Sequence, residues 1–163
     1  MSKPEVPVTT AIRVLREKKI DFRPHLYTYE EHGGTGHSAL ALNVPEHEVV
    51  KTLVMQTSDK KPLIVLMHGD REVSTKQLAR LIGVRGVEPC DEATAQRQTG
   101  YQFGGTSPFG TRHPLPVFVE RTILELPRIF INGGRRGFLV EINPADLKKA
   151  FDVVEVDVAI SAT

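Results

Sequence analysis

Hydrophobic and polar residues alternate in several short segments of the chain, and this period-two pattern predicts β-strands. The strongest segments are VVKTLVMQ at 49–56 and PLIVLMHG at 62–69, which the polar residues TSDKK separate as a hairpin turn would. FRPHLYTY at 22–29 predicts another strand, and VVEVDV at 153–158 predicts the last one. Further short β-like segments lie between 101 and 142: the aromatic YQF, then LPVFVE, RTILEL, RIFING and FLVEI.

Helical periodicity and capping residues occur between these strands. The first helix is TTAIRVLREKKI, capped by Thr9 or Thr10, and the polar, glycine-rich residues 30–38 predict a loop before the short helix SALALNV, which Pro45 ends. A further helix is predicted from the cap Ser74 to Leu81, with Gly83 as the stop, and another over CDEATAQRQ at 90–98. The last predicted helix is NPADLKKAF, with Asn143 as the cap and Pro144 at the first helical position. The pattern therefore predicts an α+β fold with a mixed or antiparallel sheet.

Size and composition are those of an ordinary globular domain, and we expect residues 1–163 to form a single one. The longest apolar runs, such as 63–67, are too short to span a bilayer, and the N-terminus lacks an apolar signal region. A cytoplasmic location and no membrane partner are the resulting expectations. The single cysteine, Cys90, excludes an internal disulfide and a cysteine-based metal cluster.

The charge balance limits how the chain could hold nucleic acid. Its 21 Lys and Arg nearly cancel its 20 Asp and Glu, and it has no Trp and only three Tyr for stacking on bases. Nucleic-acid binding is therefore expected to be local, salt-sensitive and weak, or shared with a partner, since autonomous tight binding usually requires a strong basic patch.

Lys51 is the residue of greatest chemical interest. Strand alternation places it on the same face as Val49, Leu53 and Met55, which is the more apolar face of its segment. Its side chain either extends to a solvated edge or lines a partly desolvated pocket, where its cation could bind an anionic group. Alternation alone leaves both interpretations open.

Two glycine-rich segments each allow two interpretations. Gly104, Gly105 and Gly110 lie within seven residues, and they form either a wide turn or a loop whose backbone approaches a ligand closely. In INGGRRGFLVEI at 131–142, the glycines frame two arginines between strands. This segment is either a hairpin with solvated arginines or an anion site made of turn amides and guanidinium groups.

The remaining reactive side chains point to no metal, cofactor or nucleophile. None of the histidines pairs with a carboxylate at a metal-binding spacing, and His32 and His37, five residues apart, form only a weak candidate. Cys90 lies near a predicted helix start, where a thiolate is favoured, but it has no evident base and is interpreted as structural. No serine lies in a G-x-S-x-G context.

Three segments together, VVKTLVM, TGYQFGGTSPFG and INGGRRGFLVEINPADL, resemble the YbaK/EbsC family of aminoacyl-tRNA deacylases. The resemblance covers nearly the whole chain. It implies a mixed, largely antiparallel, barrel-like sheet flanked by helices, and the editing of mischarged proline tRNA. It also implies two partners, the 3′ acceptor end of an aminoacylated tRNA and, in a transient complex, prolyl-tRNA synthetase.

The resemblance assigns roles to individual residues. Lys51 matches the family's active-site lysine, and the GGTSP segment matches a loop that forms a wall of the aminoacyl pocket, so Lys51, Gly104 and Gly105 are the predicted catalytic residues. The predicted substrate-binding residues are Tyr27, Thr35, Thr106, Ser107, Pro108, Gly133, Gly134, Arg135 and Leu139.

Two of these positions depart from the family's cysteine-specific members. Those relatives carry an aromatic residue where this chain has Thr35, and often an acidic residue where it has Leu139. Cys-tRNA(Pro) is the expected substrate, and an alanyl- or other small aminoacyl-tRNA is the alternative. An inactive module that binds a tRNA end or a synthetase is a third hypothesis.

The expected mechanism is the positioning of the ester, because the chain shows no paired carboxylates, metal cluster or Ser/His nucleophile. Release would use the thiol of a cysteinyl substrate, which leaves as a thiolactone, or a positioned water. Such editing meets a physical need, because a synthetase pocket discriminates a missing methylene by only about 1–3 kcal/mol.

Overall fold

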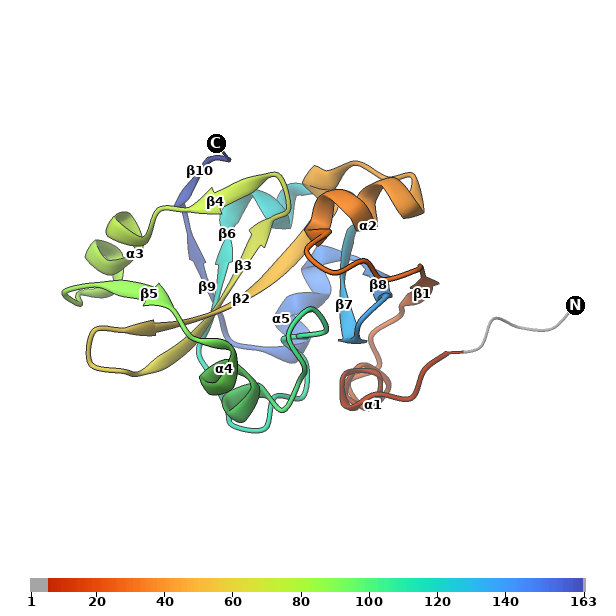
Figure 1. Ribbon diagram of the computed structural model, residues 1–163, viewed down its shortest axis with the longest axis horizontal. Helices are drawn as coiled ribbons and strands as arrows, with labels where there is room; N and C mark the ends of the chain where they lie inside the picture. Colours follow the sequence, from red (N-terminus) through yellow and green to blue (C-terminus); the bar gives the residue numbers. More distant parts are fainter. Residues whose placement is uncertain (1–5, 163) are drawn as a thin grey trace, which may run out of the picture.

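A long antiparallel hairpin occupies the middle of the molecule in the computed structural model, which describes residues 6–162 (Figure 1). Its strands, β2 (Val49–Thr57) and β3 (Pro62–His68), pair from Val50 opposite His68 to Gln56 opposite Pro62. They belong to an eight-stranded sheet in the order β1-β8-β7-β2-β3-β6-β9, with β5 paired to β2 as well. β2–β7, β3–β6 and β6–β9 are parallel and the other pairs are antiparallel, so the predicted α+β class with a mixed sheet is confirmed.

The other elements surround this hairpin. The remaining strands of the large sheet are β1 (Arg23–Leu26), β5 (Val87–Pro89), β6 (Val117–Glu120), β7 (Ile129–Arg135), β8 (Phe138–Ile142) and β9 (Val153–Val156), while β4 (Arg71–Val73) and β10 (Ala159–Ser161) form a small second sheet. The helices are α1 (Thr10–Glu17), α2 (Gly34–Leu42), α3 (Thr75–Ile82), α4 (Glu92–Thr99) and α5 (Leu147–Ala150), with 3₁₀ turns at Glu46–Glu48, Arg121–Glu125 and Pro144–Asp146.

The helix boundaries that depend on capping residues agree with those predicted from the sequence. The hydroxyls of Thr9 and Ser74 accept hydrogen bonds from backbone N–H groups at the starts of α1 and α3, and Gly83 ends α3 in a left-handed conformation. The Asn143 side chain accepts from the N–H of Ala145, as expected of a cap. The carboxylate of Asp91 likewise caps α4.

Several predicted elements are wrong. The loop predicted over 30–38 is largely helical, because α2 begins at Gly34, and Asn43 ends it in a left-handed conformation before Pro45 is reached. The segment 101–103 is not a strand and follows the end of α4 directly. RTILEL forms a 3₁₀ turn that buries Ile123, and the last strand is β10 rather than β9. The strands that sequence reading missed, such as β5, are only three residues long, too short to show alternation.

The two faces of the hairpin carry different hydrophobic clusters. On one face, Val50, Ile64 and Leu66 pack with α1 and the buried Phe109. The opposite face carries two separate clusters, one of Met55, Val65 and Met67 packed with α3, the other of Val49, Phe130 and Leu139 packed with α2. Because alternate residues of a strand share a face, Lys51 lies on this second face, between the two clusters. No helix in the described residues is long and apolar enough to cross a membrane.

Candidate functional site

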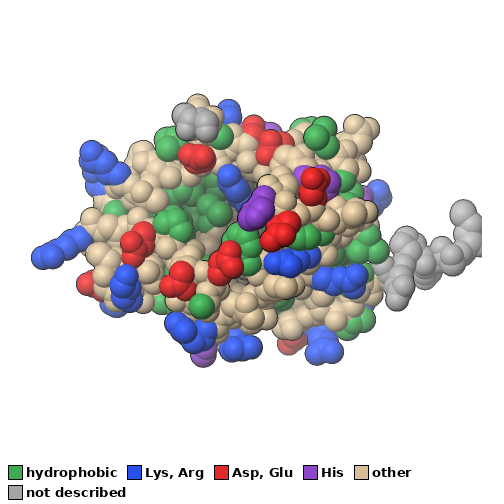
Figure 2. All heavy atoms as spheres, viewed as in Figure 1, with side chains coloured by type: hydrophobic (Ala, Val, Ile, Leu, Met, Phe, Trp, Pro, Cys, Tyr) green, Lys and Arg blue, Asp and Glu red, His purple; other side chains and the backbone are tan. Residues whose placement is uncertain are grey.

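The interval between the two clusters is a cavity of about 590 Å³. Figure 2 shows a recess lined by hydrophobic side chains over β2 and β3, with a basic side chain beside it. Its walls come from the middle of β2, the first turns of α2, the end of β5, and the segments that follow β1 and α4. Of the predicted site residues, those that line it are Tyr27, Thr35, Lys51, Gly104, Thr106 and Leu139.

Lys51 is the cation of this cavity. Its residue is half-buried, and it lines the cavity from the middle of β2. Among residues 6–162, no carboxylate lies within ion-pair distance of its ammonium group. A cation in a largely apolar recess without a protein counter-ion is suited to binding an anionic group or a developing negative charge. The pocket interpretation of Lys51 is therefore the one that its geometry favours.

Tyr27 and Leu139 form one apolar end of the cavity. The backbone N–H of Tyr27 donates to the carbonyl of Gly137 at 2.9 Å, which extends the pairing of β1 with β8 by one residue. Burial raises the pKa of the Tyr27 phenol, with a smaller opposing effect from a hydrogen bond to Ser38. The phenol therefore stays protonated at neutral pH and remains a hydrogen-bond donor. Leu139, only 4% exposed, packs beside it and presents an uncharged wall.

Thr35 lies in the first turn of α2, and its hydroxyl is already engaged. The oxygen lies 2.7 Å from Oε2 of Glu46 and 3.1 Å from the carbonyl of Gly69, so it donates to one of two acceptors in neighbouring elements. These contacts tie the start of α2 to the 3₁₀ turn and to the end of β3. The glycine-rich sequence of α2 has a low helix propensity, and this tertiary tether helps to explain why a helix forms there.

The glycine loop approaches other parts of the protein more than it approaches the cavity. Gly104 and Thr106 line the cavity, but a Cβ at Gly105 would lie 2.8 Å from the backbone nitrogen of Arg136. The N–H of Gly105 donates to the carbonyl of Gln102, so it is not free for a substrate. Both findings argue against the catalytic role predicted for Gly105.

Ser107 and Pro108 lie outside the cavity lining as well. Both are buried, and the Ser107 hydroxyl accepts a hydrogen bond from the N–H of Phe109 at 3.2 Å. The Tyr101 hydroxyl donates to the carbonyl of Phe109, and burial raises the pKa of Tyr101 to about 12. This part of the loop is an anchor that holds residues 104–106 in place.

The second glycine segment, 131–142, is a hairpin whose residues Asn132 and Leu139 line the cavity. The side-chain oxygen of Asn132 accepts from the N–H groups of Gly134 and Arg135, at 2.6 and 3.1 Å, so these turn amides are already used. Gly133 lies against Phe138, and Arg135 is exposed. Gly133, Gly134 and Arg135 do not line the cavity, and this geometry favours a hairpin over an anion site.

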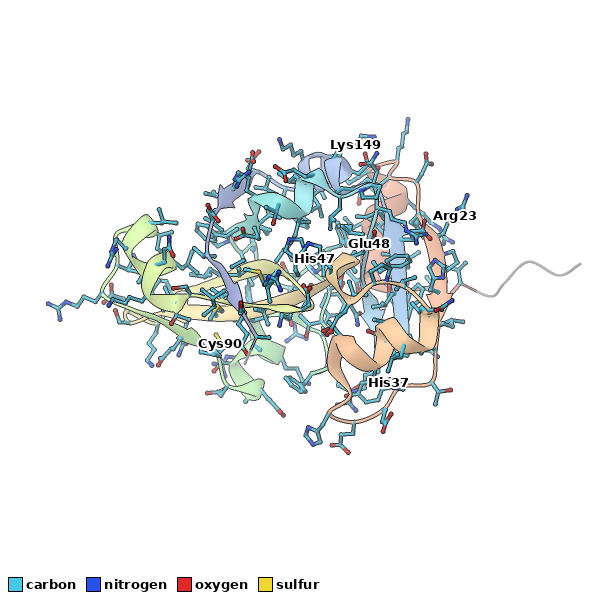
Figure 3. The ribbon with its side chains drawn as sticks, turned by 90° about the horizontal axis from the view of Figure 1, so that it is seen from above. Arg23, His37, His47, Glu48, Cys90 and Lys149 are labelled. Carbon is cyan, nitrogen blue, oxygen red and sulfur yellow. The ribbon has the colours of Figure 1, made fainter. Side chains whose placement is uncertain are left out.

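Other residues of the cavity were missed by sequence reading. Tyr29 and Phe103 stand at the rim, joined by Arg136, whose Nε donates to the Phe103 carbonyl at 2.8 Å and whose Cζ lies 5.0 Å from the Tyr29 ring centre. Cys90 lines the cavity beside the hairpin, and Figure 3 shows it well apart from His37, which lines the cavity from α2. Burial, followed by the charges of Asp91 and Glu88, raises the pKa of the Cys90 thiol, so the thiolate expected near a helix start is not favoured.

One cluster of possible metal ligands lies outside the cavity. His47 and Asp70 form a hydrogen bond at 2.9 Å, and the rings of His47 and His68 stack at 3.8 Å. Both ring nitrogens of His68 are occupied, by the carbonyl of His47 and by the hydroxyl of Thr122. His68 therefore has no free nitrogen for a metal, and the cluster is better explained as a hydrogen-bond network around the buried His68.

Residues 34–150 match the sequence profile of the aminoacyl-tRNA editing domain, and the chain belongs to this family. Lys51, the glycine loop and most of the cavity lining lie within the matched residues, while the cavity wall that follows β1, which includes Tyr27 and Tyr29, precedes them. Aminoacyl-tRNA editing, by deacylation of the ester that joins an amino acid to tRNA, is thus the function that the family assigns. The resemblance to the YbaK/EbsC deacylases is confirmed.

Individual relatives agree with this assignment. The Enterococcus faecalis protein named "Putative Cys-tRNA(Pro)/Cys-tRNA(Cys) deacylase EbsC" is 26% identical over 137 residues, which are 83% of this chain and 84% of that protein. The proline–tRNA ligase of Streptococcus thermophilus is 25% identical over 107 residues, 65% of this chain but only 17% of the ligase. A crystal structure described as "a putative trans-editing enzyme for prolyl tRNA synthetase" shares the fold, with a TM-score of 0.80 and 19% sequence identity. The similarity covers 96% of this chain and 100% of that structure's chain.

Proposed function

We propose that the protein is a trans-editing deacylase that clears mischarged tRNA(Pro), with Cys-tRNA(Pro) as its principal substrate. The observation that carries the proposal is Lys51, which lies within the matched family region, lines a largely apolar cavity and has no ion-pair partner among residues 6–162. The match to EbsC, over most of both chains, supports cysteinyl-tRNA as the substrate. Similarity to proline–tRNA ligases supports a connection with proline tRNA.

In the proposed mechanism, the chain positions the ester rather than attacking it. Lys51 binds the 3′ end of the tRNA and stabilises the negative charge that develops on the reacting oxygen. The backbone of Gly104 and Thr106 forms the wall beside it. For a cysteinyl ester the substrate's own thiol attacks the carbonyl, and the tRNA leaves as a cyclic thiolactone forms. For an amino acid without a thiol, water takes this place.

The partner proposed for this reaction is prolyl-tRNA synthetase, in a transient complex. The net charge of +1 offers little long-range attraction for a polyanionic tRNA. Affinity and tRNA identity could then be supplied by a synthetase that already holds the tRNA, because tethering raises the effective concentration of the acceptor end.

A second candidate is the removal of alanine or another small amino acid by water. It is supported by Leu139, which gives the cavity an uncharged wall, and by Thr35, whose hydroxyl is engaged with Glu46 or Gly69. Neither side chain offers a free polar group for the thiol of a cysteinyl substrate.

The two candidates are separated by the release of labelled amino acid from tRNA(Pro) carrying cysteine, alanine or proline, with catalytic amounts of protein. Rapid loss of cysteine, with the thiolactone as the released product, supports the proposal. Loss of alanine alone supports the second candidate. Loss of neither, with protection of the charged tRNA, would show a binding module instead.

A further inference from the structure

Strand β2 is paired with one strand along most of one edge, but with two different strands at the two ends of its other edge. β3 pairs with it from Val50 to Gln56. Along its other edge, β7 pairs only at Val49 and Val50, and β5 pairs only from Met55 to Thr57. Thr52 lies in the interval, and among residues 6–162 no strand pairs with it on this side.

The backbone groups of Thr52 point into this interval. The carbonyl of Val54 faces it, because it accepts a hydrogen bond from the N–H of Cys90 at 3.0 Å. The carbonyl of Val49 faces the opposite edge, where the N–H of Gly69 donates to it. Since backbone groups alternate between the two edges of a strand, the N–H and C=O of Thr52 face the same edge as those of Val54. Thr52 lines the cavity, next to Lys51.

An α-aminoacyl ester has the atoms that would fill this vacancy. Its nitrogen, α-carbon and carbonyl have the same connectivity as one residue of a β-strand. In an antiparallel ladder, two directly opposed residues exchange a pair of N–H···O bonds. A free aminoacyl group can make the same exchange, with its ammonium as donor and its ester carbonyl as acceptor.

We propose that the aminoacyl group of the substrate occupies the vacant ladder position opposite Thr52. The inference rests on the proposed function and specifies which backbone groups of the site bind the aminoacyl group of the substrate. The carbonyl of Thr52 accepts from the α-ammonium group, and the N–H of Thr52 donates to the ester carbonyl. The second bond polarises the carbonyl that is attacked, on the same strand that carries Lys51.

This arrangement predicts weaker binding of the correct product, a prolyl ester. In a prolyl ester the nitrogen keeps two N–H groups, but its ring bond to Cδ fixes the directions in which they point. A prolyl ester therefore cannot turn its N–H groups to fit the carbonyl of Thr52 without moving the whole ring. Alanyl and cysteinyl esters can, since their ammonium groups rotate freely.

A binding experiment tests the inference without relying on catalysis. Non-hydrolysable adenosine analogues that carry 3′-alanylamino or 3′-prolylamino groups are titrated into labelled protein, and the backbone amide resonance of Thr52 is followed by NMR. The expected result is a shift of the Thr52 amide with the alanyl analogue, which binds about tenfold or more tightly than the prolyl one. Equal affinity for both, an unmoved Thr52 amide, or no binding by either would overturn the inference.

A backbone substitution tests the N–H of Thr52 directly. Replacing Thr52 with its α-hydroxy acid exchanges this N–H for an oxygen and leaves the side chain intact. The same exchange at Lys76 is the control, because it lies in the first turn of α3, where N–H groups lack intrahelical partners. Deacylation by the Thr52 variant is expected to slow about tenfold or more, while the Lys76 variant keeps the wild-type rate.

The outcomes separate this inference from the proposed function. If the wild-type protein deacylates the ester and the folded Thr52 variant does so at the same rate, the ladder arrangement is overturned and the proposed function stands. Failure of the wild-type protein to deacylate any tested ester would refute the function, and the NMR titration would still decide whether Thr52 binds an aminoacyl group.

Discussion

Gly104 lies so close to Tyr29 that a methyl group added at Gly104 would stand 2.7 Å from the Tyr29 hydroxyl oxygen. Gly104 also has a left-handed backbone, with φ of +86°. Both residues line the cavity. The glycine therefore allows the loop after α4 to close against the aromatic rim, so the close approach at Gly104 is to Tyr29 of the protein itself.

Gly104→Ala is expected to lower kcat/KM by about tenfold or more, because the loop or Tyr29 must move. The left-handed conformation alone costs a non-glycine residue about 1–2 kcal/mol of stability. Gly83→Ala is the matched control, since Gly83 has φ of +76° and no atom within 4 Å of the added methyl group. Equal kinetic effects of the two substitutions would show that contact with Tyr29 is unimportant.

Tyr101→Phe is expected to destabilise the fold by about 1–3 kcal/mol, because it leaves the buried carbonyl of Phe109 without the hydroxyl that donates to it. Urea unfolding measures the change. Since Phe109 anchors the loop from within the core, the variant should also lose activity at temperatures well below its midpoint. An unchanged unfolding midpoint would show that this hydrogen bond does not hold the loop.

Thr35→Val is expected to cost about 1 kcal/mol of stability, because the start of α2 loses its hydrogen bond to Glu46 or Gly69. Thr35→Ser keeps the hydroxyl and serves as the control. Thermal unfolding of both variants gives the comparison. If valine and serine have the same effect, the loss comes from packing and not from the hydroxyl.

Stability is expected to fall as the pH decreases below about 6.5, the ordinary pKa of histidine. Burial lowers the pKa of His68 in the folded protein, with a smaller opposing effect from its hydrogen bond to the His47 carbonyl. The unfolded chain therefore binds a proton at a higher pH than the folded protein, and acid favours unfolding. His68→Gln should show a shallower pH dependence between about pH 5 and 7.5, measured by urea unfolding. An unchanged slope would assign the pH dependence to other groups.

The parts of the fold that could be predicted from the sequence depend on residues that are close to one another along the chain. The β2–β3 hairpin has strong alternation on both strands, and the helix starts at Ser74 and Asn143 are fixed by side chains that cap their own helix. The glycine-rich start of α2 was misread because Gly34 and Gly36 are poor helix formers. Its helix instead depends on a contact from Thr35 to Glu46, eleven residues away.

The parts of the site that could not be predicted depend on contacts between distant segments. Ser107 lies in a loop that resembles the family's pocket wall, yet its burial follows from the docking of Phe109 into the core. The His47–His68 stack joins a 3₁₀ turn to the end of β3. The vacancy opposite Thr52 exists because the pairing of β2 with β7 ends at Val50 and its pairing with β5 begins at Met55, which no local pattern in β2 reveals.

The central claim is that Lys51 acts in the cavity of a deacylase. Its most direct test is the single-turnover rate of amino acid release from Cys-tRNA(Pro) and Ala-tRNA(Pro) by Lys51→Ala. Lys61→Ala is the control, because Lys61 is an exposed lysine at the turn of the same hairpin. We expect Lys51→Ala to lose about 100-fold or more in rate with its fold intact, and Lys61→Ala to match the wild type. Full activity of a folded Lys51→Ala protein would contradict the account.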